Sequence, residues 1–142
     1  MTPVVYWSVL EPGGRQPTRG HADDAGWDLI VSYPASIRPG ELCNVKTSIA
    51  VAIPTGWFGH LIGRSSTPRR YGVSVVSAVI DAGYRGELFV QVRNMTDGTV
   101  NIPEGVKLAQ LLLHQVPAVR WIQVPHLPNS ARGVNGFGST GE

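Results

Sequence analysis

The chain has 142 residues, of which 42% are hydrophobic and 15% are charged, and its formal net charge is +2. The length suits a single domain, and the composition excludes an intrinsically disordered protein. The apolar runs are too short for a membrane helix, which needs roughly 20 residues. The 12 basic residues are scattered along the chain and form no stripe. We therefore expect neither a membrane nor a nucleic acid as a partner.

Two features of the sequence bear on the compartment. The N-terminus lacks a basic segment followed by an apolar core, so no signal peptide is expected. Cys43 is the single cysteine, which excludes an intrachain disulfide and fits a reducing compartment. These features predict an intracellular protein, cytoplasmic or nuclear. Nothing in the composition identifies a protein partner.

Short apolar stretches separated by Gly and Pro predict an all-β protein, a β-sandwich or barrel. Between residues 44 and 53, Val, Thr and Ile recur at every second position and predict one continuous strand that ends at Pro54. Residues 67–72 begin with Thr-Pro and end with Gly, which predicts a helix about one turn long. The strand predicted at 108–115 is almost entirely apolar as far as Leu113, so we expect both of its faces to be covered. The other predicted strands are 4–10, 28–32, 57–62, 88–93, 100–102 and 119–124, with a loop at 11–24.

Residues 77–94 are predicted to form a central hairpin: a short strand, a turn with one carboxylate and one aromatic side chain, and a second strand. Gly83 and Gly86 bracket Tyr84, so the backbone can bend tightly there and a ligand can approach it closely. Asp81 follows an apolar run, which is an unusual place for a solvated charge. The alternatives are an Asp that simply starts the turn and a Tyr84 that packs in the core.

Residues 129–142 are a different kind of segment, rich in Gly with Ser and Thr, in which Phe137 is the one large apolar side chain. Such a segment cannot bury enough surface to fold alone. We therefore divide the chain into a β domain, residues 1–128, and a mobile C-terminal arm, residues 129–142. One interpretation is a frayed tail, but a tail without a role has no need for an Arg, an aromatic ring and two hydroxyls between glycines.

Five segments resemble, in order and approximate spacing, the five motifs of the homotrimeric dUTPases, and they span nearly the whole chain. The last of them is highly specific. The segments are Ala25-Gly26-Trp27-Asp28-Leu29, Gly63-Arg64-Ser65-Ser66, Ala78-Val79-Ile80-Asp81 with Tyr84-Arg85-Gly86, Gly105-Val106-Lys107-Leu108-Ala109-Gln110-Leu111, and Arg132-Gly133-Val134-Asn135-Gly136-Phe137-Gly138-Ser139-Thr140-Gly141.

The resemblance implies a jelly-roll β-sandwich with one very short helix, and a homotrimer whose sites are shared between subunits. It implies hydrolysis of dUTP to dUMP and pyrophosphate with Mg²⁺. That reaction limits uracil incorporation into DNA and supplies dUMP for dTMP synthesis. By the same resemblance, Asp81 is the general base that orients a water for in-line attack on the α-phosphorus. Asp28 holds Mg²⁺ through water, unless it is an ordinary loop aspartate.

The resemblance also implies how the substrate binds, with the arm closing over the active site as a lid. Tyr84 lies under the sugar and leaves no room for a 2′-hydroxyl. Uracil presents an acceptor, a donor and an acceptor, which a strand backbone can match with N–H, C=O and N–H, whereas cytosine would meet like groups. Gln110 either points into the phosphate site or bonds to neighbouring backbone. The implied substrate-binding residues are Ser77, Ala78 and Val79 for the base, Tyr84 for the sugar, Arg64, Ser65, Ser66 and Gln110 for the phosphates, and Arg132, Phe137, Gly138, Ser139 and Thr140 in the arm, with Phe137 stacked on uracil and the hydroxyls on the γ-phosphate.

The chain departs from the family pattern in three places. Ala78 stands where the family usually has Gly, and Val106-Lys107 stand where it usually has Asp-Arg. The loop at residues 20–24 is more acidic than usual. None of these departures removes a group that the resemblance assigns to chemistry.

Two alternative functions stay open at this point. A dCTP deaminase has a related fold and similar motifs, but it needs a Glu on the second hairpin strand, where Gln91 stands here. A non-catalytic regulatory trimer on the same fold would have no use for Asp28, Asp81 and the complete arm. Both alternatives are therefore disfavoured relative to dUTP hydrolysis.

Overall fold

The computed structural model describes residues 2–138, which form eleven strands and one short helix. The elements are β1 (Tyr6–Val9), β2 (Trp27–Ile30), β3 (Ala35–Ile37), β4 (Leu42–Val45), β5 (Ile49–Ala52), β6 (Trp57–Gly63), α1 (Ser66–Tyr71), β7 (Val73–Val75), β8 (Ala78–Ile80), β9 (Val90–Asn94), β10 (Val100–Ile102) and β11 (Lys107–Gln115). The predicted all-β fold with one very short helix is confirmed.

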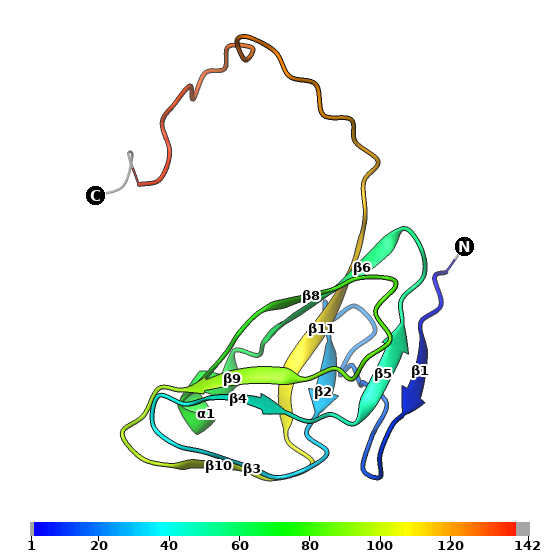
Figure 1. Ribbon diagram of the computed structural model, residues 1–142, viewed down its shortest axis with the longest axis vertical. Helices are drawn as coiled ribbons and strands as arrows, with labels where there is room; N and C mark the ends of the chain where they lie inside the picture. The colour runs from blue at the N-terminus through cyan, green and yellow to red at the C-terminus, as the bar shows by residue number, and fades with distance from the viewer. Residues whose placement is uncertain (1, 139–142) are drawn as a thin grey trace.

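All strand pairs are antiparallel, and they form four small sheets that surround one core (Figure 1). The largest sheet has the order β2-β11-β6-β8, and the second has the order β4-β9-β7. Two-stranded pairs, β1 with β5 and β10 with β3, complete the body. Strands that are adjacent in space are mostly distant in sequence, as in β-sandwiches with crossing connections.

The core lies between the sheets and is aliphatic. In β9, Val90 and Val92 are buried whereas Arg93 is exposed, as the predicted period of two requires. Each fully buried aliphatic side chain contributes about 1.5–3 kcal/mol relative to an exposed one. The core residues are Leu29, Val31, Ile37, Val45, Ile49, Val51, Ile53, Leu61, Val73, Ile80, Leu88, Val90, Val92, Ile102, Leu108, Ala109 and Leu111.

The continuous strand predicted for residues 44–53 is wrong, because the chain breaks at Ser48. This residue has φ 57°, a left-handed conformation that ends β4 and lets β5 begin in a different sheet. Val45, Thr47 and Ile49 are buried, as the alternation requires, but Ser48 and Ala50 are buried as well. The alternation therefore missed the bend between the two strands and the burial of side chains on both faces there.

The central hairpin predicted for residues 77–94 is also wrong in its pairing. β8 pairs with β6, whereas β9 lies between β4 and β7 in the other large sheet. The connection from β8 to β9 therefore crosses from one sheet to the other. Val79, which the sequence placed in a buried-looking run, is 64% exposed, and only Ile80 of that pair reaches the core. Strand partners are chosen by packing across the core, which a local pattern does not encode.

The predicted short helix is confirmed, but it begins at Ser66, two residues earlier than the expected first residue, Pro68. Pro68 is the third helical residue rather than the first, and Gly72 ends the helix in the left-handed conformation with φ 67°. The side chain of Thr67 is buried and donates a hydrogen bond to the Leu108 carbonyl at 2.8 Å. No helix within residues 2–138 is long and apolar enough to cross a membrane.

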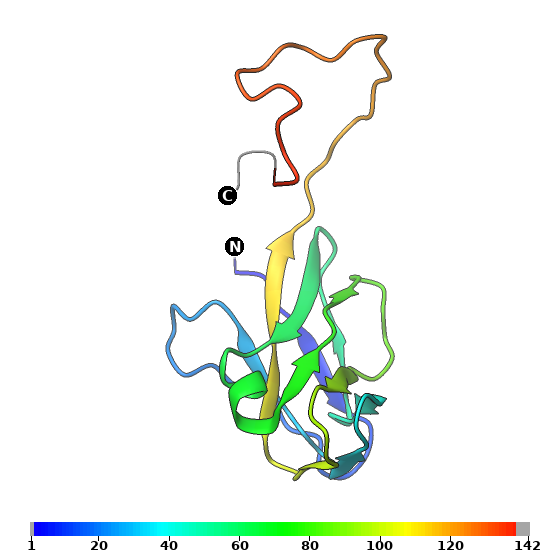
Figure 2. The same ribbon diagram turned by 90° about the vertical axis from the view of Figure 1, so that its left-hand side faces the viewer.

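After β11, residues 116–138 leave the β body as an extended segment without helix or strand (Figures 1 and 2). The strand predicted for residues 119–124 is therefore wrong. A strand needs a partner for its backbone hydrogen bonds, and no other described segment lies beside this one. Its apolar side chains are exposed, Trp121 to 95% and Ile122 to 69%.

Candidate functional site

An aspartate from β2, an arginine that follows β6 and two side chains of β11 meet at one end of the four-stranded sheet. Asp28 and Gln110 are register partners on neighbouring strands. Arg64 Nε lies 3.0 Å from Asp28 Oδ1, and Lys107 Nζ lies 3.9 Å from Asp28 Oδ2. Arg64 also donates a hydrogen bond to the Lys107 carbonyl at 2.9 Å. We call Asp28, Arg64, Lys107 and Gln110 the Asp28 cluster.

Lys107 preserves a cation where the family usually has an Arg. With one carboxylate and two cations, the Asp28 cluster carries a formal charge of +1 from its ionised groups. The Asp28 side chain is only 16% exposed, so both of its oxygens are held against cations at the edge of the solvent. Such a cluster attracts an anion that competes with the carboxylate for its two cations.

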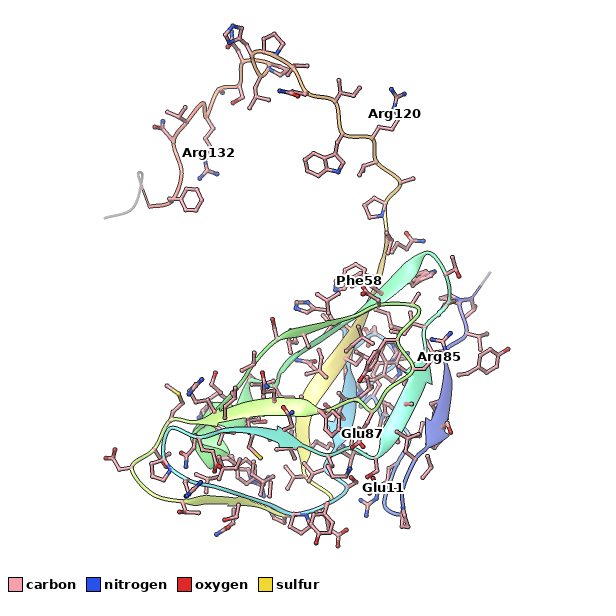
Figure 3. All side chains as sticks on the ribbon, viewed as in Figure 1. Glu11, Phe58, Arg85, Glu87, Arg120 and Arg132 are labelled. Atoms are coloured by element: carbon pink, nitrogen blue, oxygen red, sulfur yellow. The ribbon has the colours of Figure 1, made fainter. Side chains whose placement is uncertain are left out.

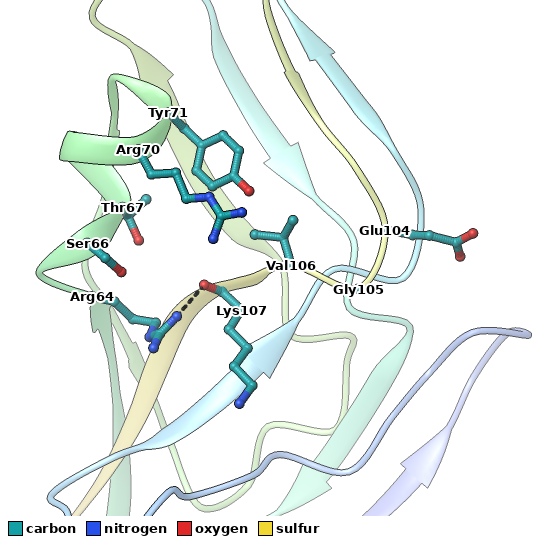
Figure 4. A pocket seen from close by; sticks show the side chains of 9 residues that line it. All are labelled: Arg64, Ser66, Thr67, Arg70, Tyr71, Glu104, Gly105, Val106 and Lys107. Atoms are coloured by element: carbon teal, nitrogen blue, oxygen red, sulfur yellow. Dashed lines mark hydrogen bonds between the residues drawn. The ribbon is translucent and has the colours of Figure 1, made fainter.

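A cavity of about 400 Å³ opens beside the Asp28 cluster (Figure 4). Arg64, Arg70 and Lys107 contribute cations to its wall, and Glu104 stands at its far edge pointing away from them (Figure 4). Guanidinium groups bind phosphate oxygens in a bidentate manner, so the lining suits a phosphorylated ligand. The other lining residues are Ser66, Thr67, Tyr71, Gly105 and Val106.

Gln110 fits into the Asp28 cluster because residue 26 is glycine. A Cβ atom at Gly26 would lie 2.5 Å from Gln110 Oε1 and 3.1 Å from its Cβ. Gln110 Nε2 donates a hydrogen bond to the Gly63 carbonyl at 3.1 Å, which is the backbone contact that one of the two predicted alternatives describes. Gly26, from the first of the five segments, and Gln110, from the fourth, therefore pack directly against each other.

The turn that carries Asp81 and Tyr84 holds itself together with local hydrogen bonds. We call residues 81–87 the Asp81 turn. The Asp81 carbonyl accepts a hydrogen bond from the Tyr84 N–H at 3.1 Å, and the Tyr84 hydroxyl donates to the Glu87 carbonyl at 2.8 Å. Arg85 donates to the Ala82 carbonyl at 2.6 Å. Asp81 is exposed and begins the turn, and Tyr84 is 42% exposed, so the alternative of a core tyrosine is wrong.

β8, which carries Ala78 and Val79 directly before the Asp81 turn, is an edge strand. It pairs with β6 on one side only, through the partners Ala78 with Leu61 and Val79 with His60. In an antiparallel strand, every second residue turns both its N–H and its C=O to the same side. The edge of β8 away from β6 is thus available for a planar ligand that can match backbone donors and acceptors.

The Asp28 cluster and the Asp81 turn lie apart within one chain. Arg64 follows Gly63 at one end of the β6 pairing, whereas Ile80, just before the turn, pairs with Gly59. Gly59 and Gly63 are four residue steps apart, which is roughly 13 Å along the strand. No hydrogen bond or salt bridge among residues 2–138 joins the two groups. The structure therefore brings together Asp28, Arg64 and Gln110, but not Asp81.

The arm lies away from both groups (Figure 3). Arg132 donates to the Asn135 carbonyl, and Gly133 N–H donates to Ser130 Oγ at 3.1 Å, so its described contacts are internal. Phe137 is fully exposed with a left-handed φ of 49°. Gly138 is the last described residue of the predicted set, and the predicted Ser139 and Thr140 lie outside the described residues.

Within the described residues, few side chains near the Asp28 cluster could serve as metal ligands. Residues 2–138 contain no group of three or more His, Cys, Asp or Glu side chains that could hold a metal ion. A metal bound mainly by the protein would need such a group, whereas Mg²⁺ that travels on phosphates typically uses one or two carboxylates and water. The partly buried carboxylate of Asp28 fits the second case and not the first.

Comparison with known proteins decides between the families that share these features. The dUTPase family model matches residues 14–141 of the chain. The chain belongs to the dUTPase family. The deoxyuridine 5′-triphosphate nucleotidohydrolase of Thermobifida fusca is 40% identical over 135 residues, which cover 93% of this chain and 75% of that protein. The corresponding protein of Tropheryma whipplei is 43% identical over 137 residues, covering 94% and 93%.

Solved dUTPase structures share the fold over nearly the whole chain. The dUTPase of Staphylococcus bacteriophage 80alpha with bound dUpNHpp has a TM-score of 0.91 and 28% identity, and the match covers 99% of this dUTPase and 100% of that chain. A mutant dUTPase of the S. aureus phage phi11, described with a structural Mg(II) ion, has a TM-score of 0.79 and 28% identity, covering 87% and 97%. The predicted family, enzyme class and fold are confirmed.

Sequence reasoning missed two cations of the dUTPase pocket, Arg70 and Lys107. Arg70 carried no motif signal, because it belongs to a short helix whose position beside β11 only the folded chain reveals. Lys107 was noted as a departure from the family, and its charge was not connected with Asp28. The strand pattern could not have suggested it, because residues three apart face opposite sides of a regular strand, and the irregularity between Lys107 and Ala109 appears only in the structure.

Proposed function

We propose that this dUTPase hydrolyses dUTP to dUMP and pyrophosphate. The observation that carries the proposal is the cationic cavity beside Asp28, within a chain whose family is named for this substrate. The triphosphate would bind to Arg64, Ser65, Ser66 and Gln110, and its negative charge would displace Asp28 from the Arg64 guanidinium. The reaction would limit uracil incorporation into DNA and supply dUMP for dTMP synthesis.

The edge of β8 that is unpaired within residues 2–138 supports the proposal that backbone groups recognise the uracil base. Backbone groups of Ser77, Ala78 and Val79 would meet the acceptor, donor and acceptor of uracil, while cytosine would leave buried polar groups unpaired at a cost of about 1–3 kcal/mol. Tyr84 lies four residues after the end of β8, and its exposed ring is available to pack under the deoxyribose. A ribose would then place its 2′-hydroxyl against the ring.

Asp81 is proposed as the general base. Its carboxylate would take a proton from a water whose oxygen forms a bond to the α-phosphorus. The bond from the α-phosphorus to the oxygen that bridges it to the β-phosphorus would break, and pyrophosphate would leave with the electron pair. The solvent-exposed position of Asp81 at the head of the turn supports a role with water. The cations of the Asp28 cluster would stabilise negative charge on the phosphates.

Mg²⁺ is proposed as the cofactor, with Asp28 as its protein carboxylate through water. The fit rests on the single, partly buried carboxylate beside a cationic phosphate pocket. The ion would supply charge neutralisation and orientation of the triphosphate. Asp28 would become available for this task when the phosphates compete with it for the Arg64 guanidinium.

A homotrimer with shared sites is proposed as the assembly. The outward face of the four-stranded sheet carries Phe58 and Leu112, both half-buried, and the 64% exposed Val79. The predicted cover on both faces of β11 is therefore incomplete within one chain, and an exposed apolar face needs a partner. The separation of the Asp28 cluster from the Asp81 turn has the same solution, because a neighbouring subunit can supply the missing half. Sedimentation of the purified protein tests the stoichiometry.

The division into a β domain, residues 1–128, and an arm, residues 129–142, remains a proposal. The body ends at β11, and the chain beyond it extends into solvent, which supports an arm that reaches another subunit. Arg132, Phe137, Gly138, Ser139 and Thr140 would close over the bound substrate and exclude water. An intracellular location, where dUTP is formed, accompanies this proposal.

The surroundings of Gln91 argue against the alternative function, a dCTP deaminase. Gln91 on β9 donates a hydrogen bond to Asn44 Oδ1 at 3.0 Å, and an amide cannot shuttle the protons that the deaminase Glu handles. The decisive experiment incubates the protein with Mg²⁺ and each of dUTP, dCTP, dTTP and UTP, and identifies the products. We expect dUMP and pyrophosphate from dUTP alone. Ammonia and dUTP formed from dCTP would overturn the proposal.

A further inference from the structure

At the last residue of the Asp81 turn, a buried carboxylate holds together segments that are distant in sequence. Glu87 has a side chain only 8% exposed, and its Oε1 lies 3.1 Å from Lys46 Nζ. Its Oε2 accepts a hydrogen bond from the Ser48 N–H at 3.0 Å. The exposed Glu11 contacts the same ammonium at 3.0 Å from the other side. Figure 3 shows Glu11 and Glu87 on neighbouring segments at this edge of the body.

The residue that Glu87 holds is the left-handed Ser48 at the break between β4 and β5. Non-glycine residues rarely adopt this backbone conformation, so the surrounding contacts must impose it. The Ser48 carbonyl accepts from Leu10 N–H at 2.8 Å, and its hydroxyl pairs with that of Ser32 at 2.6 Å. With the N–H bound to Glu87, every polar group of Ser48 is engaged. The break is thus a rigid anchor rather than a mobile hinge.

Glu87 connects Ser48 to Tyr84, because its side chain binds the Ser48 N–H and its backbone carbonyl binds the Tyr84 hydroxyl. The Tyr84 hydroxyl donates to the Glu87 carbonyl at 2.8 Å, the one hydrogen bond found for this hydroxyl among residues 2–138. The ring folds over Gly86, where a Cβ atom would overlap the phenol. The next residue, Leu88, is fully buried and donates its N–H to the Ile49 carbonyl at 2.9 Å. The position of the Tyr84 ring therefore depends on how firmly residue 87 is held.

Lys46 makes this burial of a carboxylate tolerable. An unpaired buried carboxylate is strongly unfavourable, and removal of one partner of a buried pair leaves the other uncompensated. Hydrogen bonds to Glu11 and Glu87 raise the pKa of Lys46, so its ammonium stays charged through the neutral range. The charges that face the Glu87 carboxylate within hydrogen-bond reach are this ammonium and the Ser48 amide dipole.

We propose that Glu87, held by Lys46 and the Ser48 amide, is a positioning residue that fixes the Tyr84 ring and so determines the choice of deoxyribose over ribose. Glu87 itself touches no substrate in this scheme. The inference rests on the proposed function, because only a nucleotide whose sugar packs on Tyr84 can sense the position of the ring. A loosened ring would admit the 2′-hydroxyl of UTP.

The test measures kcat/KM for dUTP and for UTP with the full-length protein and its variants. Glu87→Gln keeps the acceptor for the Ser48 amide and removes the ion pair, and Lys46→Met removes the same pair from the other side. For both variants we expect the ratio of kcat/KM for UTP to that for dUTP to rise about tenfold, the scale of one charge-assisted hydrogen bond. Lys46→Arg should restore the wild-type ratio. Glu11→Gln, the matched control on the exposed side of the same lysine, should leave it unchanged.

Thermal unfolding of each variant separates positioning from mere stability. A lower Tm with an unchanged UTP to dUTP ratio would show that Glu87 is only structural and would overturn the inference. If Lys46→Met does not fold, Glu87→Gln decides alone, because it leaves no unpaired buried charge. A wild-type protein that hydrolyses dUTP while the ratio stays constant in the variants refutes this inference only. A wild-type protein without dUTP hydrolysis refutes the proposed function and this inference together.

Discussion

The Asp28 cluster and the Asp81 turn meet different physical requirements. In the Asp28 cluster, ionic contacts join residues from three segments distant in sequence, and a carboxylate occupies the cations that a phosphate would take. In the Asp81 turn, contacts within seven consecutive residues hold the backbone, and the functional side chains are exposed. The Asp28 cluster is thus formed by tertiary packing, and its carboxylate occupies a site that an anion could take. The Asp81 turn is formed by local hydrogen bonds, and Glu87 at its end connects it to Lys46 and Ser48.

If the proposed roles of these residues hold, this difference explains why a single chain would not complete the site. The cations of the Asp28 cluster lack a general base, and the Asp81 turn lacks cations other than Arg85, whose guanidinium is bonded to the turn's own carbonyl groups. Each half supplies what the other lacks. Within one chain the sheet keeps them roughly 13 Å apart along β6. Assembly of several chains is the simplest way to bring complementary halves together, and the predictions below separate their contributions.

The largest expected effect comes from Asp81→Asn. The amide cannot accept the proton of the attacking water, so kcat should fall by about 10²–10⁴-fold. A non-hydrolysable dUTP analogue should bind as before, because the base contacts water and not uracil. Asp97→Asn, an exposed aspartate in another loop, is the control and should keep wild-type kcat. If Asp81→Asn kept near-normal turnover, the assignment of Asp81 as the general base would be wrong.

Deletion of residues 129–142 should give the next largest loss, with the β body still folded. The sharper form of the test co-refolds this truncated protein with the Asp81→Asn protein, each inactive alone. If sites are shared, some mixed assemblies contain an intact Asp81 from one chain and an intact arm from another, and activity returns. Confirmed mixed assemblies without activity would show that the arm serves the Asp81 of its own chain.

Phe137→Ala isolates the proposed stacking of the arm on uracil. Loss of base stacking is worth about 1–3 kcal/mol, which corresponds to roughly 5–150-fold in kcat/KM for dUTP. Val134→Ala, at another fully exposed apolar residue of the arm, is the matched control and should change little. Equal effects of the two substitutions would indicate a general role of the arm without stacking.

Asp28→Ala should have the smallest and most specific effect. Removal of the carboxylate should raise the Mg²⁺ concentration for half-maximal activity about tenfold, with much of the activity restored at saturating Mg²⁺. The neighbouring exposed Asp23→Ala serves as the control for a change in charge alone. A loss of activity that Mg²⁺ does not restore would instead assign Asp28 to the placement of Arg64 and Lys107.

Local patterns in the sequence predicted much of this architecture. The period of two identified Val90 and Val92 as core residues, and Gly72 was correctly expected at the end of the single short helix. The motif residues Asp28, Arg64 and Gln110, predicted to share one site, do lie together. These successes have one reason, since alternation, capping and a motif on consecutive residues are written in short stretches of chain.

Tertiary structure decided the rest. It placed β8 beside β6 instead of β9, broke the predicted strand at Ser48, and left residues 119–124 without a strand partner. It also joined Glu87 to Lys46 and Ser48, about 40 residues earlier in the chain. Alternation specifies which face of a strand is apolar, and it says nothing about which strand lies next to it. That choice depends on how all the apolar faces close together over one core.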